Sequence, residues 1–187
     1  MYAAWSVIAG EQPTTAKWNI LGSNDLSFNN GTGIANLEIG TVTALKIDWK
    51  CSGYLGNNWT NSSATFQRVP IDTLEYDTSG NMDISVNKGR ITMPAPGFMK
   101  PDFGLNVTVG ASSQHYICTL YKNGTEFKRG IDDTVNVTGS VGFECGPPAL
   151  QLNTSDYIEP YFFSSSSNTI SAGQSLVFFG AHMVSNT

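Results

Sequence analysis

Histidine and carboxylate side chains are the first places to look for acid–base catalysis in this chain. His115 and His182 each stand in a run that alternates apolar and polar residues, and neither adjoins a nucleophile signature such as Gly-x-Ser-x-Gly. A general base also needs a second and a third positioned group, and the sequence places none beside either histidine. We therefore interpret both histidines as structural or surface residues, and we predict no enzymatic activity.

Acidic residues gather loosely at a few places along the chain: Asp72, Glu75 and Asp77, then Asp132 and Asp133, and further on Asp156. Paired carboxylates are the requirement of a glycosidase, but spacing along a chain does not set the distance between two carboxyl groups. Carboxylate oxygens are also what Ca²⁺ prefers, yet the Asp-x-Asp-x-Asp-Gly pattern of a calcium loop is missing from the sequence. We interpret these residues as solvated loop charges and predict no metal and no cofactor.

Three cysteines, Cys51, Cys118 and Cys145, cannot all pair within one chain. The sequence has no Cys-x-x-Cys, and no histidine stands at metal-ligand spacing from a cysteine. We predict buried free thiols that act as small hydrophobic residues, which fits folding in a reducing compartment. A Cys118–Cys145 disulfide is the alternative.

The surface is predicted to be sparsely charged and acidic. Charged residues make up 13% of the chain, against about 25% in an average globular protein. The net charge of −5 argues against the basic surface that nucleic-acid binding requires. No apolar run approaches the roughly 18 residues of a membrane span, so no membrane insertion is predicted. The first residues lack the basic and apolar regions of a signal peptide. We therefore expect either a mature or recombinant product, or a chain made in the host cytoplasm that leaves the cell by another route, such as lysis by a virus.

Short strands separated by turn residues must position most of these side chains. Asn123-Gly124 is the strongest hairpin signal, because both residues tolerate a positive φ. The pattern predicts strands over residues 66–71, 82–86, 90–93, 98–109, 115–121, 140–145, 149–152, 157–163 and 175–184. Eight or more short strands in about 120 residues, without alternating helices, predict an all-β antiparallel jelly-roll sandwich over residues 66–187.

The N-terminal part of the chain is patterned weakly. Residues 13–22 fit a short helix that Thr14 or Thr15 caps and Gly22 ends. Such a helix is marginal alone, so the apolar residues around it need a docking surface: Trp5, Trp18, Ile20 and Leu21. We predict a small irregular extension over residues 1–50 that carries this helix, followed by a linker or loop over residues 51–65.

One predicted strand is aromatic on both faces. Tyr157, Tyr161 and Phe163 stand on one side of it, and Phe178 and Phe179 add aromatic bulk to the last strand. A sandwich strand needs only one apolar face, and a large exposed apolar patch promotes aggregation. Burial against copies of the same chain resolves this, so we predict a homotrimer with these five residues near its axis. The alternative is a thick monomer core with the tyrosine hydroxyls reaching solvent.

Four segments in order, GRITMPAPGF, ICTLYKNGTEF, ALQLNTSDYIEPYFF and SLVFFGAHMV, carry a family resemblance over residues 89–184. They resemble the globular head shared by subunit q of the first complement component and the tumour necrosis factor superfamily. The resemblance implies a jelly-roll head that assembles as a trimer and works by binding. It also implies that the two aromatic strands line the three-fold axis.

A second resemblance covers about the first 50 residues. Trp5, Gly10-Glu11, Pro13-Thr14, the run from Lys17 to Gly22, Asn24-Asp25, Ser27-Phe28-Asn29, Gly31-Thr32-Gly33-Ile34 and Lys46-Ile47-Asp48 look like a segment near the start of bacteriophage and prophage fibre proteins. In those proteins the segment precedes a variable distal domain. The resemblance implies that Trp5, Trp18, Ile20 and Leu21 belong to a particle-attachment segment.

Together the two resemblances imply a phage fibre or receptor-binding protein at the virion surface. Its trimeric head would bind a host cell-surface glycan or protein, through receptor-binding residues that the sequence does not identify, and other virion proteins would hold the N-terminal segment. A capsid or tail decoration protein with a purely structural role is the first alternative, and a secreted bacterial adhesin is the second.

Overall fold

The computed structural model describes residues 49–110 and 113–186 of the chain. In these ranges it contains fourteen strands and no helix, which confirms the all-β prediction. The predicted helix at residues 13–22 lies outside the described residues, as do the predicted attachment residues Trp5, Trp18, Ile20 and Leu21. Nothing in the described ranges forms a helix of the length and apolarity that a membrane span requires.

The strands follow one another closely along the chain, with several of only two or three residues. Their bounds are β1 Lys50–Tyr54, β2 Trp59–Asn61, β3 Gln67–Arg68, β4 Thr73–Asp77, β5 Met82–Asp83, β6 Arg90–Thr92, β7 Gly97–Val109, β8 Gln114–Lys122, β9 Thr125–Val135, β10 Gly139–Cys145, β11 Leu150–Leu152, β12 Tyr157–Ser164, β13 Asn168–Ile170 and β14 Val177–Asn186.

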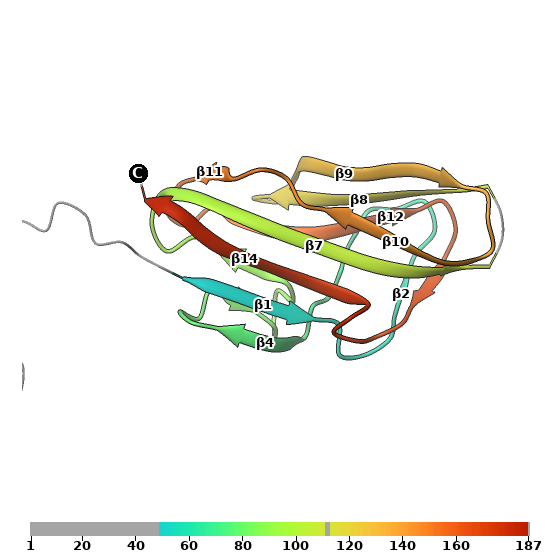
Figure 1. Cartoon of the computed structure of the whole chain (residues 1–187), viewed down its shortest axis with the longest axis horizontal. Helices are drawn as coiled ribbons and strands as arrows, with labels where there is room; N and C mark the ends of the chain where they lie inside the picture. Colours follow the sequence, from blue (N-terminus) through green and yellow to red (C-terminus); the bar gives the residue numbers. More distant parts are fainter. Residues whose placement is uncertain (1–48, 111–112, 187) are drawn as a thin grey trace, which may run out of the picture. The chain divides into compact units, whose positions relative to one another are not determined.

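Two antiparallel sheets form a sandwich. The first sheet has the order β10-β7-β14-β1-β4, with β11 paired to β7, and the second has the order β5-β6-β12-β8-β9, with β3 paired to β12. A two-stranded ribbon joins β2 to β13. The C-terminal strand β14 lies between β7 and β1, so the last strand of the chain is central to the first sheet (Figure 1).

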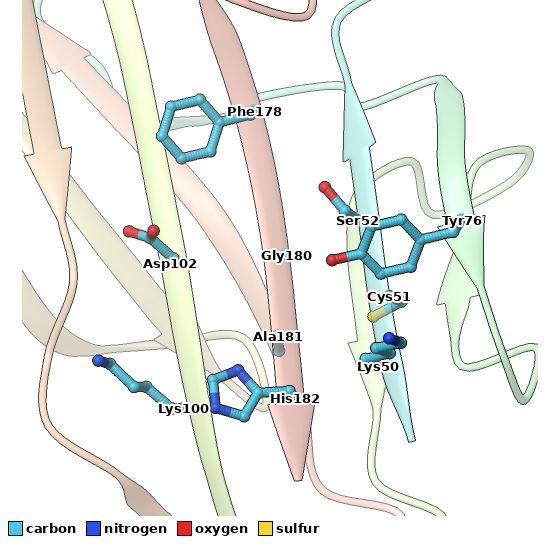
Figure 2. Close-up of a pocket in the computed structure, with 10 residues that line it drawn as sticks. All are labelled: Lys50, Cys51, Ser52, Tyr76, Lys100, Asp102, Phe178, Gly180, Ala181 and His182. Atoms are coloured by element: carbon cyan, nitrogen blue, oxygen red, sulfur yellow. The ribbon is translucent and has the colours of Figure 1, made fainter. Parts of the chain in front are cut away.

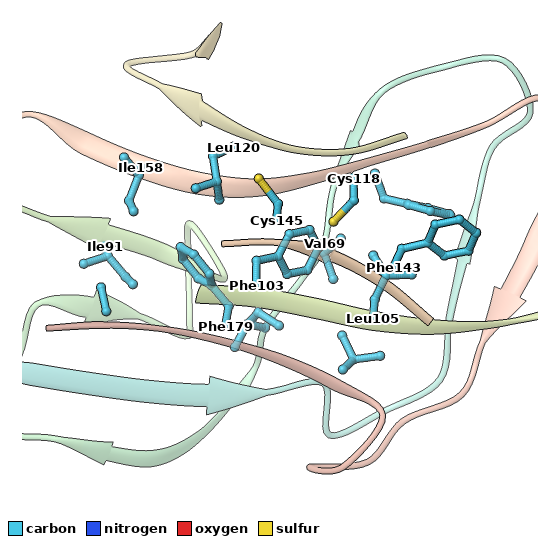
Figure 3. Packing of buried hydrophobic residues seen from close by; sticks show 14 of the residues in the cluster. Val69, Ile91, Phe103, Leu105, Cys118, Leu120, Phe143, Cys145, Ile158 and Phe179 are labelled. Carbon is cyan, nitrogen blue, oxygen red and sulfur yellow. The ribbon is translucent and has the colours of Figure 1, made fainter. Parts of the chain in front are cut away.

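The core lies between the sheets and is rich in aromatic rings (Figure 3). Phe103 of β7 and Phe179 of β14 meet edge to face with ring centroids 6.1 Å apart. Further along, the Tyr116 ring lies between Phe143 and Phe162, at centroid distances of 5.0 and 6.0 Å. The alternation that predicted the long strands thus reflects one buried side chain in every two.

The predicted linker over residues 51–65 is wrong in part. It contains most of β1, which pairs with both β14 and β4 in the middle of the first sheet, and all of β2. The inward positions of β1 are Cys51 and Gly53, which are small, so the strand has little apolar signal. Gly53 is needed there, since an added Cβ would lie 2.8 Å from Met82 Sδ and 2.9 Å from Ile71 Cγ2. The head therefore begins at or before Trp49, a fully buried residue, and not at residue 66.

The predicted strands do not include β4, β9 or β13, although the Asn123-Gly124 hairpin signal implies a strand that begins where β9 does. Strand β9 is the edge of the second sheet and is exposed along almost its whole length, and five of its residues are charged: Glu126, Lys128, Arg129, Asp132 and Asp133. Charged residues on an edge strand protect it from pairing with other chains, and they also hide the strand from an apolar periodicity. Gly130 brings β9 against β10 of the first sheet, where Cys145 Sγ donates to the Lys128 carbonyl at 3.4 Å.

Candidate functional site

The outer face of the first sheet is hollowed over its central strands. Gly180 of β14 forms part of its floor. The Phe178 ring covers Gly104 of β7 so closely that a Cβ added at Gly104 would lie 2.6 Å from the ring. The hollow has a volume of about 320 Å³ (Figure 2), and its walls and floor are Lys50, Cys51, Ser52, Tyr76, Lys100, Asp102, Phe178, Gly180, Ala181 and His182.

Aromatic and cationic side chains occupy different parts of this hollow. Figure 2 shows Lys50, Lys100 and His182 at one end, with Phe178 at the other. Tyr76 stands at the side, 45% exposed, with the Lys50 ammonium 5.8 Å from its ring centroid. Ser52 Oγ donates a hydrogen bond to Glu75 Oε2 at 2.9 Å, a contact between the neighbouring strands β1 and β4. An open face with partly exposed aromatic rings over glycine suits close packing against another protein surface.

The outer face of the second sheet carries a second group of aromatic rings. Tyr157, Tyr161 and Phe163 of β12 point outward, and the Tyr161 ring stacks on Tyr121 of β8 at 3.8 Å. The segment before β3 folds back over them, with Phe66 5.1 Å from the Phe163 ring and 6.1 Å from Tyr121. Burial raises the pKa of Tyr161, which agrees with this covering.

A buried carboxylate fixes the same covering segment. Glu159 of β12 is 2% exposed and accepts hydrogen bonds from Arg68 Nη1 at 2.6 Å and Arg90 Nε at 3.0 Å. The Arg90 guanidinium also lies 3.9 Å above the Tyr157 ring. The chain thus covers much of the second face of β12 with its own residues 66–68 and 90, so this face does not require a second copy.

The structure separates the five residues predicted for the trimer axis. Tyr157, Tyr161 and Phe163 lie on the outer face of the second sheet, and Phe178 lies on the outer face of the first. Phe179 is wrong as an interface residue, because its side chain is fully buried in the core. Phe178 and Phe179 differ in this way because neighbouring residues of a strand point to opposite faces of the sheet.

Both histidines lie in strands, as predicted. His115 of β8 pairs with Asp132 of β9, and Asp132 also accepts from Arg129 Nη1 at 2.7 Å. These hydrogen bonds, that of His115 first, hold the pKa of Asp132 below its usual value. The pair is a cross-strand contact on an exposed edge. His182 lies at the rim of the hollow in the first sheet.

The remaining carboxylates hold loops in place and do not meet one another. Asp72 accepts from the amide of Gly56 at 2.6 Å and from Asn57 at 3.1 Å. Asp156 accepts from Lys122 Nζ at 2.8 Å and Asn123 Nδ2 at 2.7 Å. Asp132 and Asp133 lie in β9 and not in a loop. Among residues 49–110 and 113–186, no three metal-binding side chains come together.

A groove on the second sheet is a further candidate that the sequence did not indicate. It has a volume of about 480 Å³ and runs between the segment around β3, the loop after β5 and the centre of β12; its lining is Trp59, Phe66, Gln67, Arg68, Pro70, Ser85, Val86, Lys88 and Tyr161. Three stretches of chain contribute to it, so no local motif marks it. Trp59 fell within the predicted linker, and Val86 within a predicted strand.

Solved structures identify the fold. The globular domain of zebrafish complement 1qA protein superposes with a TM-score of 0.54 at 14% identity, over 74% of this chain and 99% of that one. Murine APRIL at pH 5.0 superposes with a TM-score of 0.55 at 8% identity, over 73% of this chain and 99% of that one. The head is therefore an antiparallel jelly roll of the tumour necrosis factor and complement 1q type. No family model matches the chain. No curated protein matches it either.

Proposed function

We propose that the chain is a non-enzymatic surface protein of a phage virion, a fibre or receptor-binding protein whose jelly-roll head forms a homotrimer and adheres to a host cell. The observation that carries the proposal is the outer face of the first sheet. It leaves Phe178 partly uncovered and Tyr76 45% exposed, and both side chains line the hollow. Packing three such faces together would remove this surface from water.

The shared fold supports the same proposal. Residues 89–184 resemble heads of this type in sequence, and such heads are expected to assemble as trimers. The proposed three-fold axis therefore lies at the outer face of the first sheet, and not at β12. Phe178 of β14 stays near it, while Tyr157, Tyr161 and Phe163 face outward on the other sheet.

The N-terminal residues are the reason for proposing that the protein is part of a virion. Their resemblance to the start of phage fibre proteins favours an attachment segment over residues 1–48, which joins the head to other virion proteins. The mechanism is multivalent binding: three identical weak sites on one rigid head raise the avidity well above each single affinity.

Removal of the N-terminal segment tests this function. A truncated chain that starts at Ala44 retains Trp49 and β1, whereas a start at Cys51 would delete a core residue and the first residue of a central strand. The truncated head is expected to stay trimeric, to bind host cells and to compete with infection, yet to be missing from particles. Normal incorporation of the truncated head would remove the attachment role. A head that neither binds cells nor competes would favour the decoration protein.

A further inference from the structure

The groove on the outer face of the second sheet has the features of a ligand site. It is separate from the face proposed for assembly, so it stays open in the proposed trimer. Its volume of about 480 Å³ falls within the range of small-molecule sites, roughly 300 to 1,000 Å³. Trp59, Phe66 and Tyr161 line it with three aromatic rings that are each only partly buried.

These rings are held in place before any ligand arrives. Tyr161 stacks on Tyr121 at 3.8 Å, and Phe66 leans on Phe163 at 5.1 Å. Trp59 stands in β2, which pairs with β13. Rigid rings lose little conformational freedom on binding, so such a wall favours affinity.

The loop after β5 forms the opposite wall and is equally fixed. The Asp83 carboxylate accepts hydrogen bonds from the backbone amides of Ser85, Val86 and Asn87 at 2.8, 3.1 and 2.9 Å. These bonds, that of Ser85 first, hold the pKa of Asp83 below its usual value. The loop therefore presents Val86, which is 80% exposed, in one conformation at the mouth of the groove. A large apolar side chain held so firmly in water suggests a binding contact.

The lining of the groove has two cationic side chains, Arg68 and Lys88, and no carboxylate, although the chain is acidic overall. Arg68, Arg90 and Lys88 face two carboxylates, Glu159 and Asp72. Arg68 reaches Glu159 through Nη1, and the Lys88 ammonium is a loose 3.7 Å from Asp72 with its side chain 42% exposed. Lys88 is thus placed to turn toward an anion, and Arg68 keeps further donors for it.

We propose that this groove binds an acidic sugar, such as a uronic or sialic acid of a cell-surface glycan. A sugar ring offers an apolar C–H face to the aromatic rings and hydroxyl groups to the polar rim, and its carboxylate matches Lys88 and Arg68. An extended peptide fits less well, because the strands that line the groove beside β12 are β2 and β3, of three and two residues, which are too short to pair with it. The inference rests on the proposed function, since it names the ligand class of the adhesive head.

Titration of the full chain with glucuronic acid, N-acetylneuraminic acid and neutral glucose tests the inference. The indole N–H signal of Trp59, assigned in the proton–nitrogen spectrum with a Trp59→Phe variant, reports binding at the groove. We expect the acids to shift this signal and glucose to bind about tenfold more weakly, the loss of one charge-assisted contact. Added salt should weaken the binding of the two acids and leave the binding of glucose unchanged.

Two lysine variants separate the groove from the rest of the surface. Lys88→Gln should weaken the binding of both acids about tenfold and leave the binding of glucose unchanged, while Lys128→Gln on β9, outside the groove and the hollow, should change neither. The inference is overturned if no sugar shifts Trp59, if Lys88→Gln binds the acids like the wild type, or if poly-glutamate shifts Trp59 and the sugars do not. If the head adheres to host cells but no sugar shifts the Trp59 signal, the proposed function stands and the acidic-sugar ligand is wrong. If the sugars shift the signal but the head does not adhere to cells, the sugar site stands and the proposed adhesion is wrong.

Discussion

Burial keeps the three cysteine thiols neutral. Cys51, Cys118 and Cys145 are each at most 1% exposed and have free thiols, and Cys118 and Cys145 lie in the core between the sheets (Figure 3). Desolvation raises the pKa of Cys51 to about 12 and that of Cys145 to about 11, and it raises the pKa of Cys118 well above its usual value. Because the thiolate is the reactive form, both the burial of these residues and their raised pKa protect them from reaction.

Alkylation measures this protection. Native protein treated with iodoacetamide at pH 8 should carry no label on these three residues by mass spectrometry, and protein unfolded in guanidinium without reductant should carry a label on all three. A disulfide between Cys118 and Cys145 would instead leave a single label after unfolding. Rapid labelling of the native protein would contradict the burial.

Asp156 links stability to pH. Its carboxylate accepts from Lys122 Nζ, Asn123 Nδ2 and the Asn153 amide, and these bonds, that of Lys122 first, lower its pKa from 3.8 to about 2. A group with a depressed pKa stabilises the folded state above its unfolded pKa, and this contribution is lost as the pH falls through the folded value. Asp156 should therefore stabilise the head at pH 5 and above, and progressively less from about pH 4 to pH 2.

Replacement by the amide tests that linkage. Asp156→Asn should lower the free energy of unfolding by about 1 to 2 kcal/mol at pH 7, and the difference from wild type should be small at pH 2 and vanish at about pH 1. Urea unfolding at several pH values gives both curves. Asp133→Asn is the control, since Asp133 bonds to the amide of its neighbour Thr134, and should change stability by less than about 0.5 kcal/mol. A difference that persists unchanged at pH 2 would contradict the linkage.

At the scale of the element, β9 closes one side of the sandwich by its contact with β10. Gly130 makes the contact possible, because an added Cβ would meet the Glu144 carbonyl and lie 2.6 Å from Cys145 Cα. Both obstacles are backbone, which cannot turn aside as a side chain can. Any larger residue at position 130 must push β9 away from β10 and disturb the Cys145–Lys128 hydrogen bond.

Gly130→Ala should therefore lower the free energy of unfolding by about 1 to 3 kcal/mol, as overpacking does. Amide hydrogen exchange in β9 should also become faster. Gly142→Ala in β10 is matched to it, because its added Cβ would have no atom within 4 Å, and should be nearly neutral. Equal effects of the two substitutions would show that the close approach does not matter.

Which elements the sequence predicted follows from what each strand buries. Strands β7, β8, β12 and β14 alternate large apolar and polar residues, so their periodicity is visible in the sequence. Strand β1 buries small residues and β9 buries almost none, so neither has such a period. The groove was invisible for a different reason: residues 59–70, 85–88 and 161 meet only after folding.

At the scale of the whole molecule, the two outer sheet faces differ in how far the chain itself covers them. The aromatic surface on β12 is largely covered by the chain itself, through Phe66, Arg68 and Arg90. Among the described residues, the face around Phe178 leaves Tyr76 45% exposed, with the Phe178 ring packed over Gly104. In the proposed trimer, assembly through the first sheet would leave the groove of the second sheet facing outward, where a ligand can reach it.

A charge placed on each face distinguishes the two modes of assembly. Light scattering on the wild type should give three times the chain mass of 20.1 kDa. Phe178→Glu should weaken assembly about a hundredfold or more, since three like charges would be buried together, and should yield monomer at micromolar concentration. Tyr161→Glu, on the opposite face, should remain trimeric. Dissociation by Tyr161→Glu with a trimeric Phe178→Glu would put the axis on the second sheet, and a monomeric wild type would remove the trimer altogether.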